Sequence, residues 1–144
     1  MPPKTNSKKT APKKSTSKAA KRKRLDDARG AAMALEAAGK FEAAARLYQA
    51  AAALGDLAAQ VSLANILAGK LPVPRPEDAV IWYKRAVQHG SASAAYHLAL
   101  YYQSTEDTRA CKRWLTRAAE MGDRDAKKML KLSVKPAKPK STKH

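Results

Sequence analysis

The sequence predicts an all-α fold: a short α-solenoid of antiparallel helix pairs, about seven helices in total, flanked by disordered basic tails. The first observation is a repeat, because the eight residues from Trp82 to the residue before Gly90 recur in kind from Trp114 to the residue before Gly122. The two tryptophans are 32 residues apart, a period typical of stacked two-helix units. The second is that alanine and leucine recur at helical spacing between the tails. The third is that the basic charge is concentrated at the two ends.

Residues that favour helix ends divide the middle of the chain into seven segments. We expect helices over residues 25–38, 41–54, 57–68, 76–90, 92–103, 105–122 and 123–132, the fourth and sixth ranges including the glycine that ends them. Asp56 and Ser91 suit N-cap positions, and Pro76 suits the first turn of its helix. Three acidic pairs stand at expected helix starts, where the helix dipole favours negative charge: Asp26-Asp27, Glu77-Asp78 and Glu106-Asp107. The pairs therefore indicate capping rather than catalytic carboxylates.

Alignment on three helix-ending glycines, Gly55, Gly90 and Gly122, shows small residues at fixed positions. They are Ala59, Ala94 and Ala126 after the glycine, and Ala51, Ala86, Ala118, Ala44, Ala79 and Cys111 before it. A leucine recurs eight residues after each glycine, as Leu63, Leu98 and Leu130. Small residues at such spacing allow two helices to pack closely, so the unit is predicted to be a helical hairpin.

This pattern resembles the Sel1-like repeats, a subgroup of the tetratricopeptide-like α-solenoids, over about residues 25–132. The matching residues are Ala94, Leu98, Ala99, Tyr102, Trp114, Arg117, Ala118, Ala119 and Gly122, and also Ala59, Leu63, Ala64, Gly69, Ala79, Trp82, Tyr83, Arg85, Ala86 and Gly90. The resemblance implies docking of a protein partner in a groove lined by the first helix of each pair. Family geometry would place Arg29, Met33, Asn65, Tyr96 and Leu100 there. The loop containing Leu71 and Pro72 departs from the family pattern.

Residues that could perform chemistry are few. His89 precedes a helix-ending glycine, His97 could face the groove, and Cys111 takes a small-residue packing position. No phosphate-binding glycine loop, nucleophile elbow or metal-ligand spacing is present, so the sequence predicts a non-enzymatic protein without a metal or other cofactor. A single cysteine excludes an intramolecular disulfide. No apolar run reaches the ~18 residues of a membrane span, and no apolar segment follows the basic N-terminus as in a secretory signal.

The net charge of +17 resides mainly in the two ends. Residues 1–24 contain ten Lys or Arg and no acid, residues 133–144 contain four more, and residues 25–132 sit near +3. Both tails contain little to bury, so we expect them to be disordered. The expected domains are a basic tail over 1–24, a helical repeat domain over 25–132 and a second basic tail over 133–144.

The tail cations predict non-specific nucleic-acid binding through phosphate contacts, without aromatic stacking groups for base recognition. The candidate residues are Lys8, Lys9, Lys13, Lys14, Lys18, Lys21, Arg22, Lys23 and Arg24. Residues 21–24 also resemble a nuclear import signal, and an anionic lipid or another acidic partner remains an alternative.

Together these features predict an adaptor whose repeats dock a protein and whose tails bind nucleic acid. The alternative is a pure protein-interaction module, a regulator or secreted effector, whose basic N-terminus is a targeting signal. The expected location is intracellular, cytoplasmic or nucleoid-associated, or nuclear in a eukaryotic cell.

Overall fold

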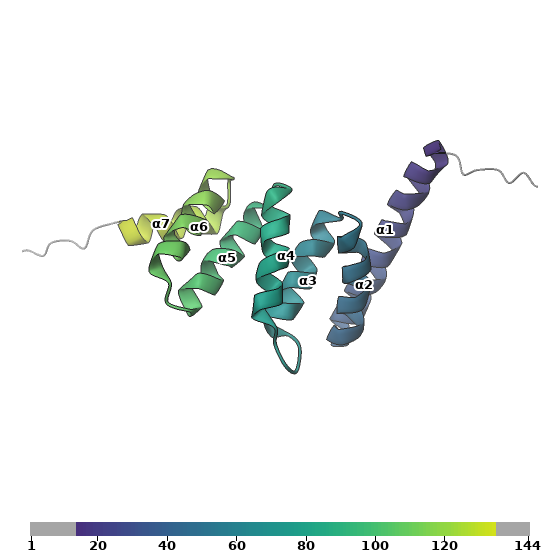
Figure 1. Ribbon diagram of the computed structural model, residues 1–144, viewed down its shortest axis with the longest axis horizontal. Coiled ribbons are helices and arrows are strands. Elements are labelled where there is room, and N and C mark those ends of the chain that lie inside the picture. Colours follow the sequence, from purple (N-terminus) through teal and green to yellow (C-terminus); the bar gives the residue numbers. More distant parts are fainter. Residues whose placement is uncertain (1–13, 135–144) are drawn as a thin grey trace, which may run out of the picture.

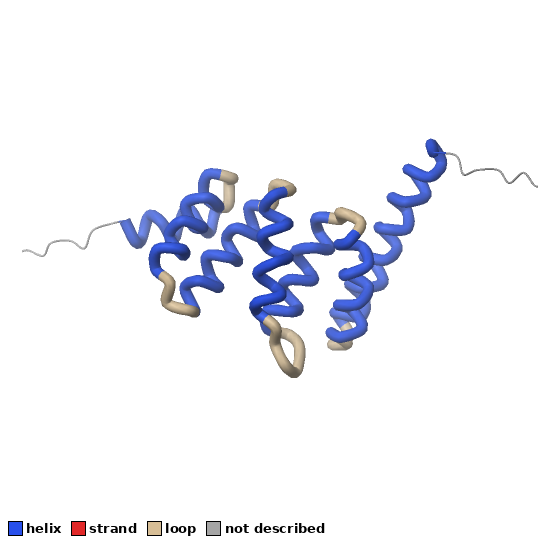
Figure 2. The backbone as a smooth tube through the Cα atoms, in the orientation of Figure 1, coloured by secondary structure: helices blue, strands red, loops and turns tan. Residues whose placement is uncertain are grey.

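A computed structural model of the chain describes residues 14–134, and over that range it consists of helices joined by short connections, with no strand. The helices are α1 (Lys14–Ala37), α2 (Phe41–Ala53), α3 (Leu57–Gly69), α4 (Pro76–Gln88), α5 (Ala92–Ser104), α6 (Thr108–Glu120) and α7 (Arg124–Val134). Each helix contacts the next one along the chain. The helices follow one another in a row along the long axis of the molecule, with connections at alternating ends (Figures 1 and 2). The predicted all-α solenoid of antiparallel helix pairs is confirmed.

Side-chain caps begin several of the helices as the sequence predicts. The Asp56 carboxylate accepts a hydrogen bond from the Ala59 backbone N–H at 2.9 Å, and the Ser91 hydroxyl oxygen accepts one from Ala94 at 3.0 Å. The same arrangement, a side chain accepting from the backbone three residues later, occurs at Asp123. These bonds satisfy backbone N–H groups that have no partner within the helix.

The start of the first helix differs from the prediction. Residues 14–24 are helical and continuous with α1, so the expectation of a disordered segment is wrong for these residues, and residues 1–13 lie outside the described range. Lysine, arginine and alanine are good helix formers, and no proline or glycine interrupts the chain between residue 14 and Gly30. Asp26 and Asp27 therefore lie in the middle of a helix, where dipole interactions at its N-terminus do not explain them. At the other end α7 extends to residue 134, and residues 135–144 lie outside the described range.

The connection between α5 and α6 also departs from the prediction. Asp107 caps α6, which begins at Thr108, so Thr105 and Glu106 belong to the turn and not to the helix. Glu106 has φ 61°, the left-handed conformation that Gly90 and Gly122 adopt at the ends of α4 and α6. A glutamate in this conformation is strained because its Cβ approaches the backbone, so the turn between α5 and α6 forms at an energetic cost.

The core consists mainly of the small residues that recur in the sequence. Each of these alanines is at most 1% exposed: Ala44, Ala51, Ala59, Ala79, Ala86, Ala94, Ala118 and Ala126. Leu63 and Leu98 are buried with them, whereas Leu130 at the same position of α7 is half-buried. Close approach of the helix backbones explains why alanine is required at these positions.

The last described helix has the polar character of a terminal cap. Lys131 stands nine residues after Gly122, and Ala64 and Ala99 hold the corresponding position after the glycines that precede α3 and α5. Those two alanines are buried, whereas Lys131 is exposed. A further helix packed on α7 in the same way would bury this lysine, so α7 has the polar outer face expected of a terminal cap.

Candidate partner-binding surfaces

Three of the five residues predicted to line a partner groove lie on the first helices of two adjacent repeats. Asn65 belongs to α3, and Tyr96 and Leu100 belong to α5. Their α1 counterparts, Arg29 and Met33, belong to the first helix of the row. The first helices supply all five, as the repeat pattern predicts.

A cluster of polar and aromatic side chains joins α3, α4 and α5. The Tyr83 hydroxyl on α4 donates a hydrogen bond to Asn65 Oδ1 at 2.5 Å. The Tyr83 ring stacks on the His97 ring with centroids 5.2 Å apart and planes 10° apart, and Tyr96 meets His97 edge-on at 6.0 Å. We call these four residues, with Leu100, the aromatic cluster. It brings three rings and an amide together across three helices.

His97 is held in one orientation within the aromatic cluster. Its Nδ1 lies 2.9 Å from the backbone oxygen of Ser93, and a carbonyl oxygen can only accept, so Nδ1 carries the proton. In the neutral ring Nε2 is then an acceptor that could receive a hydrogen bond from a partner. A pocket of about 440 Å³ lies beside the ring and is lined by Tyr83, His97 and Leu100 among others. Burial raises the pKa of Tyr83, which keeps its hydroxyl a donor.

In the sequence, Tyr83 only matches the repeat pattern, and His97 is a residue that could face the groove. Tyr83 is buried, at 3% exposure, and its hydroxyl links the second helix of one pair to Asn65 on the first. The position of Tyr83 directly after Trp82 in the sequence does not predict this hydrogen bond. It depends on how two helices face each other, which only the packed structure shows.

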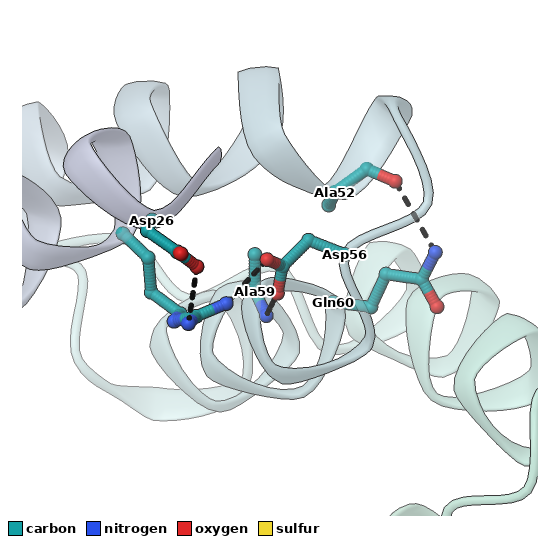
Figure 3. A network of polar contacts seen from close by, with 6 residues as sticks. Asp26, Ala52, Asp56, Ala59 and Gln60 are labelled. Atoms are coloured by element: carbon teal, nitrogen blue, oxygen red, sulfur yellow. Dashed lines mark hydrogen bonds and ion pairs between the residues drawn. The ribbon is translucent and has the colours of Figure 1, made fainter. Parts of the chain in front are cut away.

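Arg29 has a structural role that the sequence did not indicate. Its guanidinium forms ion pairs with Asp26, one turn earlier on α1, at 3.0 Å, and with Asp56 at the start of α3. Figure 3 shows Asp26 and Asp56 converging on this position, with Asp56 also capping Ala59. The Asp56 side chain is only 7% exposed. Arg29 therefore ties α1 to α3 and remains partly exposed, whereas Met33 is 56% exposed.

The basic candidates fall into three groups. Lys8, Lys9 and Lys13 lie outside the described residues, and of Lys14 only the backbone, in α1, is described. Lys18, Lys21, Arg22, Lys23 and Arg24 are exposed along the N-terminal part of α1. An open cleft of about 590 Å³ lies between this part of α1 and the start of α3. Lys18, Lys21 and Arg22 line it, together with Leu25, Asp26, Arg29, Asp56, Leu57 and Ala58.

Other candidate chemistry is absent from the range 14–134 or explained by packing. No group of three or more His, Cys, Asp or Glu side chains there could hold a metal ion. Cys111 is a half-buried free thiol, and burial raises its pKa, which lowers its reactivity. Among the described helices, none combines the length and apolar character needed to cross a bilayer.

The fold and these surfaces define a helical-repeat scaffold of the protein-interaction class. A family model described as Sel1 repeat matches residues 40–56, 57–91 and 92–123. These matches cover more than half of the sequence, and the chain belongs to the Sel1 repeat family. They divide the structure as the helices do, with α3–α4 and α5–α6 as two full repeats and α2 as the second half of a preceding one. A comparison with curated proteins found no match.

Family membership bears on function at a coarse level. Sel1 repeats are generally non-catalytic scaffolds for protein interaction, and they imply that this chain binds a protein partner. The aromatic cluster lies on the two matched full repeats.

Proposed function

We propose that the protein is an adaptor: its Sel1 repeats dock a segment of a partner protein on the aromatic cluster, and its basic residues attach it to nucleic acid. The observation that carries the proposal is the separation of the two surfaces. The aromatic cluster lies on α3 to α5, and the exposed cations lie on the N-terminal turns of α1. One chain can therefore hold both ligands at once.

The protein-docking surface is supported by its chemistry. Asn65 uses Oδ1 to accept from Tyr83, which leaves its amide N–H groups as donors, and His97 keeps Nε2 as an acceptor. A peptide backbone offers both a carbonyl acceptor and an N–H donor. The half-buried rings of Tyr96 and His97 supply apolar contact area at low cost in side-chain entropy.

A binding assay with truncated chains tests the nucleic-acid function. Gel shifts with an arbitrary DNA duplex should show retention by the full chain and loss of retention after deletion of residues 1–24 and 133–144. If six to ten cations contact phosphate, the affinity of the full chain should fall by about 10³ to 10⁵ between 50 and 200 mM salt. Unchanged retention by the truncated chain would contradict the proposal.

Substitutions in the aromatic cluster test the docking surface. Cross-linking and affinity purification with nuclease treatment should recover a partner with the full chain, and Tyr96→Ala with Leu100→Ala should lose it. The matched control is Lys112→Ala with Arg113→Ala, two exposed residues of α6 outside the aromatic cluster. Equal loss with both pairs would place the docking surface elsewhere.

The second candidate is a pure protein-interaction module whose basic N-terminus is a targeting signal. Four consecutive exposed cations, residues 21–24, favour it. Neutralising these four should then abolish the localisation of a fluorescent fusion and leave DNA retention nearly unchanged. The proposed adaptor function predicts instead that neutralising these four residues lowers DNA retention.

A further inference from the structure

The N-terminal part of α1 projects beyond the rest of the solenoid. α1 has 24 residues and α2, the helix it pairs with, has 13. The first α1 side chains that pack against the core are Leu25 and Ala28, and residues 18–24 are all exposed. Figure 1 shows this end of α1 extending past the turn between α2 and α3. At 1.5 Å per residue, the eleven residues from 14 to 24 form a helix about 16 Å long, and residues 18–24 of it are exposed.

Cations surround this projecting helix. Five of the seven residues from 18 to 24 are Lys or Arg, and the other two are Ala19 and Ala20. At 100° per residue, Lys18, Lys21 and Arg22 share the side that continues toward α3, Lys23 lies opposite, and Arg24 lies between. Lys23 forms an exposed ion pair with Asp27 at 3.4 Å, while Lys18, Lys21 and Arg22 have no ion pair within the described residues. A partner that meets this helix must present negative charge on more than one side.

We propose that the projecting turns of α1 enter the major groove of duplex DNA as a helix, with its cations contacting phosphates on both flanking strands. This inference rests on the proposed nucleic-acid function and assigns that function a structural element and a form of nucleic acid. A helix with side chains is about 10–12 Å wide and the B-form major groove is about 12 Å wide. Phosphates border the groove on both sides, which matches cations distributed around the helix. The alanines offer no hydrogen bonds to base edges, so the contact is blind to sequence.

The base of the projecting helix is fixed to the solenoid. Arg29 joins Asp26 on α1 to Asp56 on α3, and Leu25 packs against the core (Figure 3). The Asp26 carboxylate is 54% exposed and borders the cleft, so it repels phosphate at this point. The DNA-contacting surface therefore ends before residue 25. Because these contacts fix α1 to the solenoid, they also fix the orientation of the solenoid and its docked partner relative to the bound duplex.

Repulsion between the cations of the projecting helix lowers its helix content when no DNA is bound. Lys18 is followed by Lys21 and Arg22 at helical contact distances of three and four residues, and Lys21 is followed by Arg24. Like charges at these spacings destabilise a helix. Phosphates that neutralise the cations remove this penalty. Helix content should therefore increase when duplex DNA binds.

Glycine substitution separates helix geometry from charge. In the full chain, Ala19→Gly with Ala20→Gly keeps every cation and disfavours the helix at two sites, so we expect about tenfold to thirtyfold weaker binding of a DNA duplex in fluorescence anisotropy. The matched control is Thr10→Gly with Ala11→Gly, which adds two glycines to the same basic segment before α1 begins and should bind like the unaltered chain. Circular dichroism should show a gain of helix on DNA addition for the unaltered chain and a smaller gain for the residue 19 and 20 variant.

The outcomes distinguish this inference from the proposed function. If deletion of residues 1–24 abolishes DNA binding but the glycine pair at 19 and 20 has no effect, the segment acts as a flexible polycation, and the inference is overturned while the proposed function stands. If deletion of residues 1–24 has no effect but deletion of residues 1–24 and 133–144 together abolishes DNA binding, only this inference fails; if the double deletion has no effect, both fail. Double-stranded RNA has a deep, narrow major groove that does not admit a helix, so duplex DNA should bind more tightly than an RNA duplex of equal length. Equal binding of the two duplexes, or equally effective competition by poly-glutamate of the same charge, would overturn groove recognition.

Discussion

The Tyr83 hydroxyl on α4 donates a 2.5 Å hydrogen bond to Asn65 Oδ1 on α3, and the same tyrosine ring stacks on His97 of α5. One side chain thus connects the two helices of a Sel1 repeat to the first helix of the next. The bond holds the Asn65 amide in place, and the stacking holds the histidine ring. Packed neighbours therefore fix the orientation of the two side chains that the proposed docking surface uses.

A double-mutant cycle should measure this link. Tyr83→Phe removes the hydroxyl and leaves the half-buried Asn65 amide without its partner, so we expect a loss of about 1–2 kcal/mol in unfolding free energy. Asn65→Ala in the Tyr83→Phe background should cost less than in the unaltered chain, with a coupling of about 1 kcal/mol by urea unfolding. Additive effects would mean that the two side chains do not interact.

Stability should decrease at alkaline pH through the same tyrosine. Burial raises the pKa of Tyr83 above its ordinary value of 10.0, so the folded state keeps the proton longer than the unfolded chain does. The contribution is fully present below pH 10 and is lost as the pH rises above it, by about 1.4 kcal/mol at pH 11 for one tyrosine. Urea unfolding at pH 8, 10 and 11 should show a smaller decrease for Tyr83→Phe. Tyr48, whose pKa is raised by burial and by its bond to Glu36, contributes to the decrease that remains.

Replacing Glu106 by glycine should stabilise the protein. Glu106 has φ 61° in the turn before α6, and glycine adopts this conformation without the clash of a Cβ. We expect a gain of about 0.5–1 kcal/mol in unfolding free energy, measured by thermal or urea unfolding. The control is Lys112→Gly, an exposed site within α6, which should lower stability by about 1 kcal/mol. A loss of stability in both variants would show that the turn is not strained.

Asp56 should contribute more to the free energy of unfolding than a residue that only caps a helix, because it also forms an ion pair with Arg29. Asp56→Asn keeps an oxygen that can accept from the Ala59 N–H but removes the charge beside Arg29, so we expect a loss of about 1 kcal/mol. Asp56→Ala removes both interactions and should cost about 2–3 kcal/mol. Asp107→Ala removes a cap of the same kind without an ion pair and should cost about 1 kcal/mol. Equal costs for Asp56→Ala and Asp107→Ala would show that the pair adds nothing.

The helices whose ends carry strong local signals were predicted closely from the sequence. α3 and α5 begin after Asp56 and Ser91, as expected, because capping depends on a side chain and a backbone group three residues apart. The start of α1 was missed because a charged segment with nothing to bury was expected to be disordered. The helix that packs on α2 supplies its nucleus, and from there lysine, arginine and alanine can extend it.

The candidate docking surface was predicted in part. Asn65, Tyr96 and Leu100 follow from repeat register, whereas Tyr83 and the tie through Arg29 do not. Residues at equivalent positions of the repeats are found by aligning the repeats in the sequence, so their place on the fold can be predicted. Contacts such as Asn65 with Tyr83 depend on side-chain direction and on the relative rotation of two helices.

By itself the sequence determined the repeat, the Sel1-like hairpins and the uneven distribution of charge, because periodicity, capping and net charge are properties of local order along the chain. The tertiary structure decided which polar groups are free to bind. Arg29 is engaged by Asp26 and Asp56, the aromatic cluster is assembled from three helices, and the cations of α1 are carried on a projecting helix. The reason is that a side chain's availability depends on neighbours brought to it by helix packing, and Asp56 lies 27 residues from the arginine it binds.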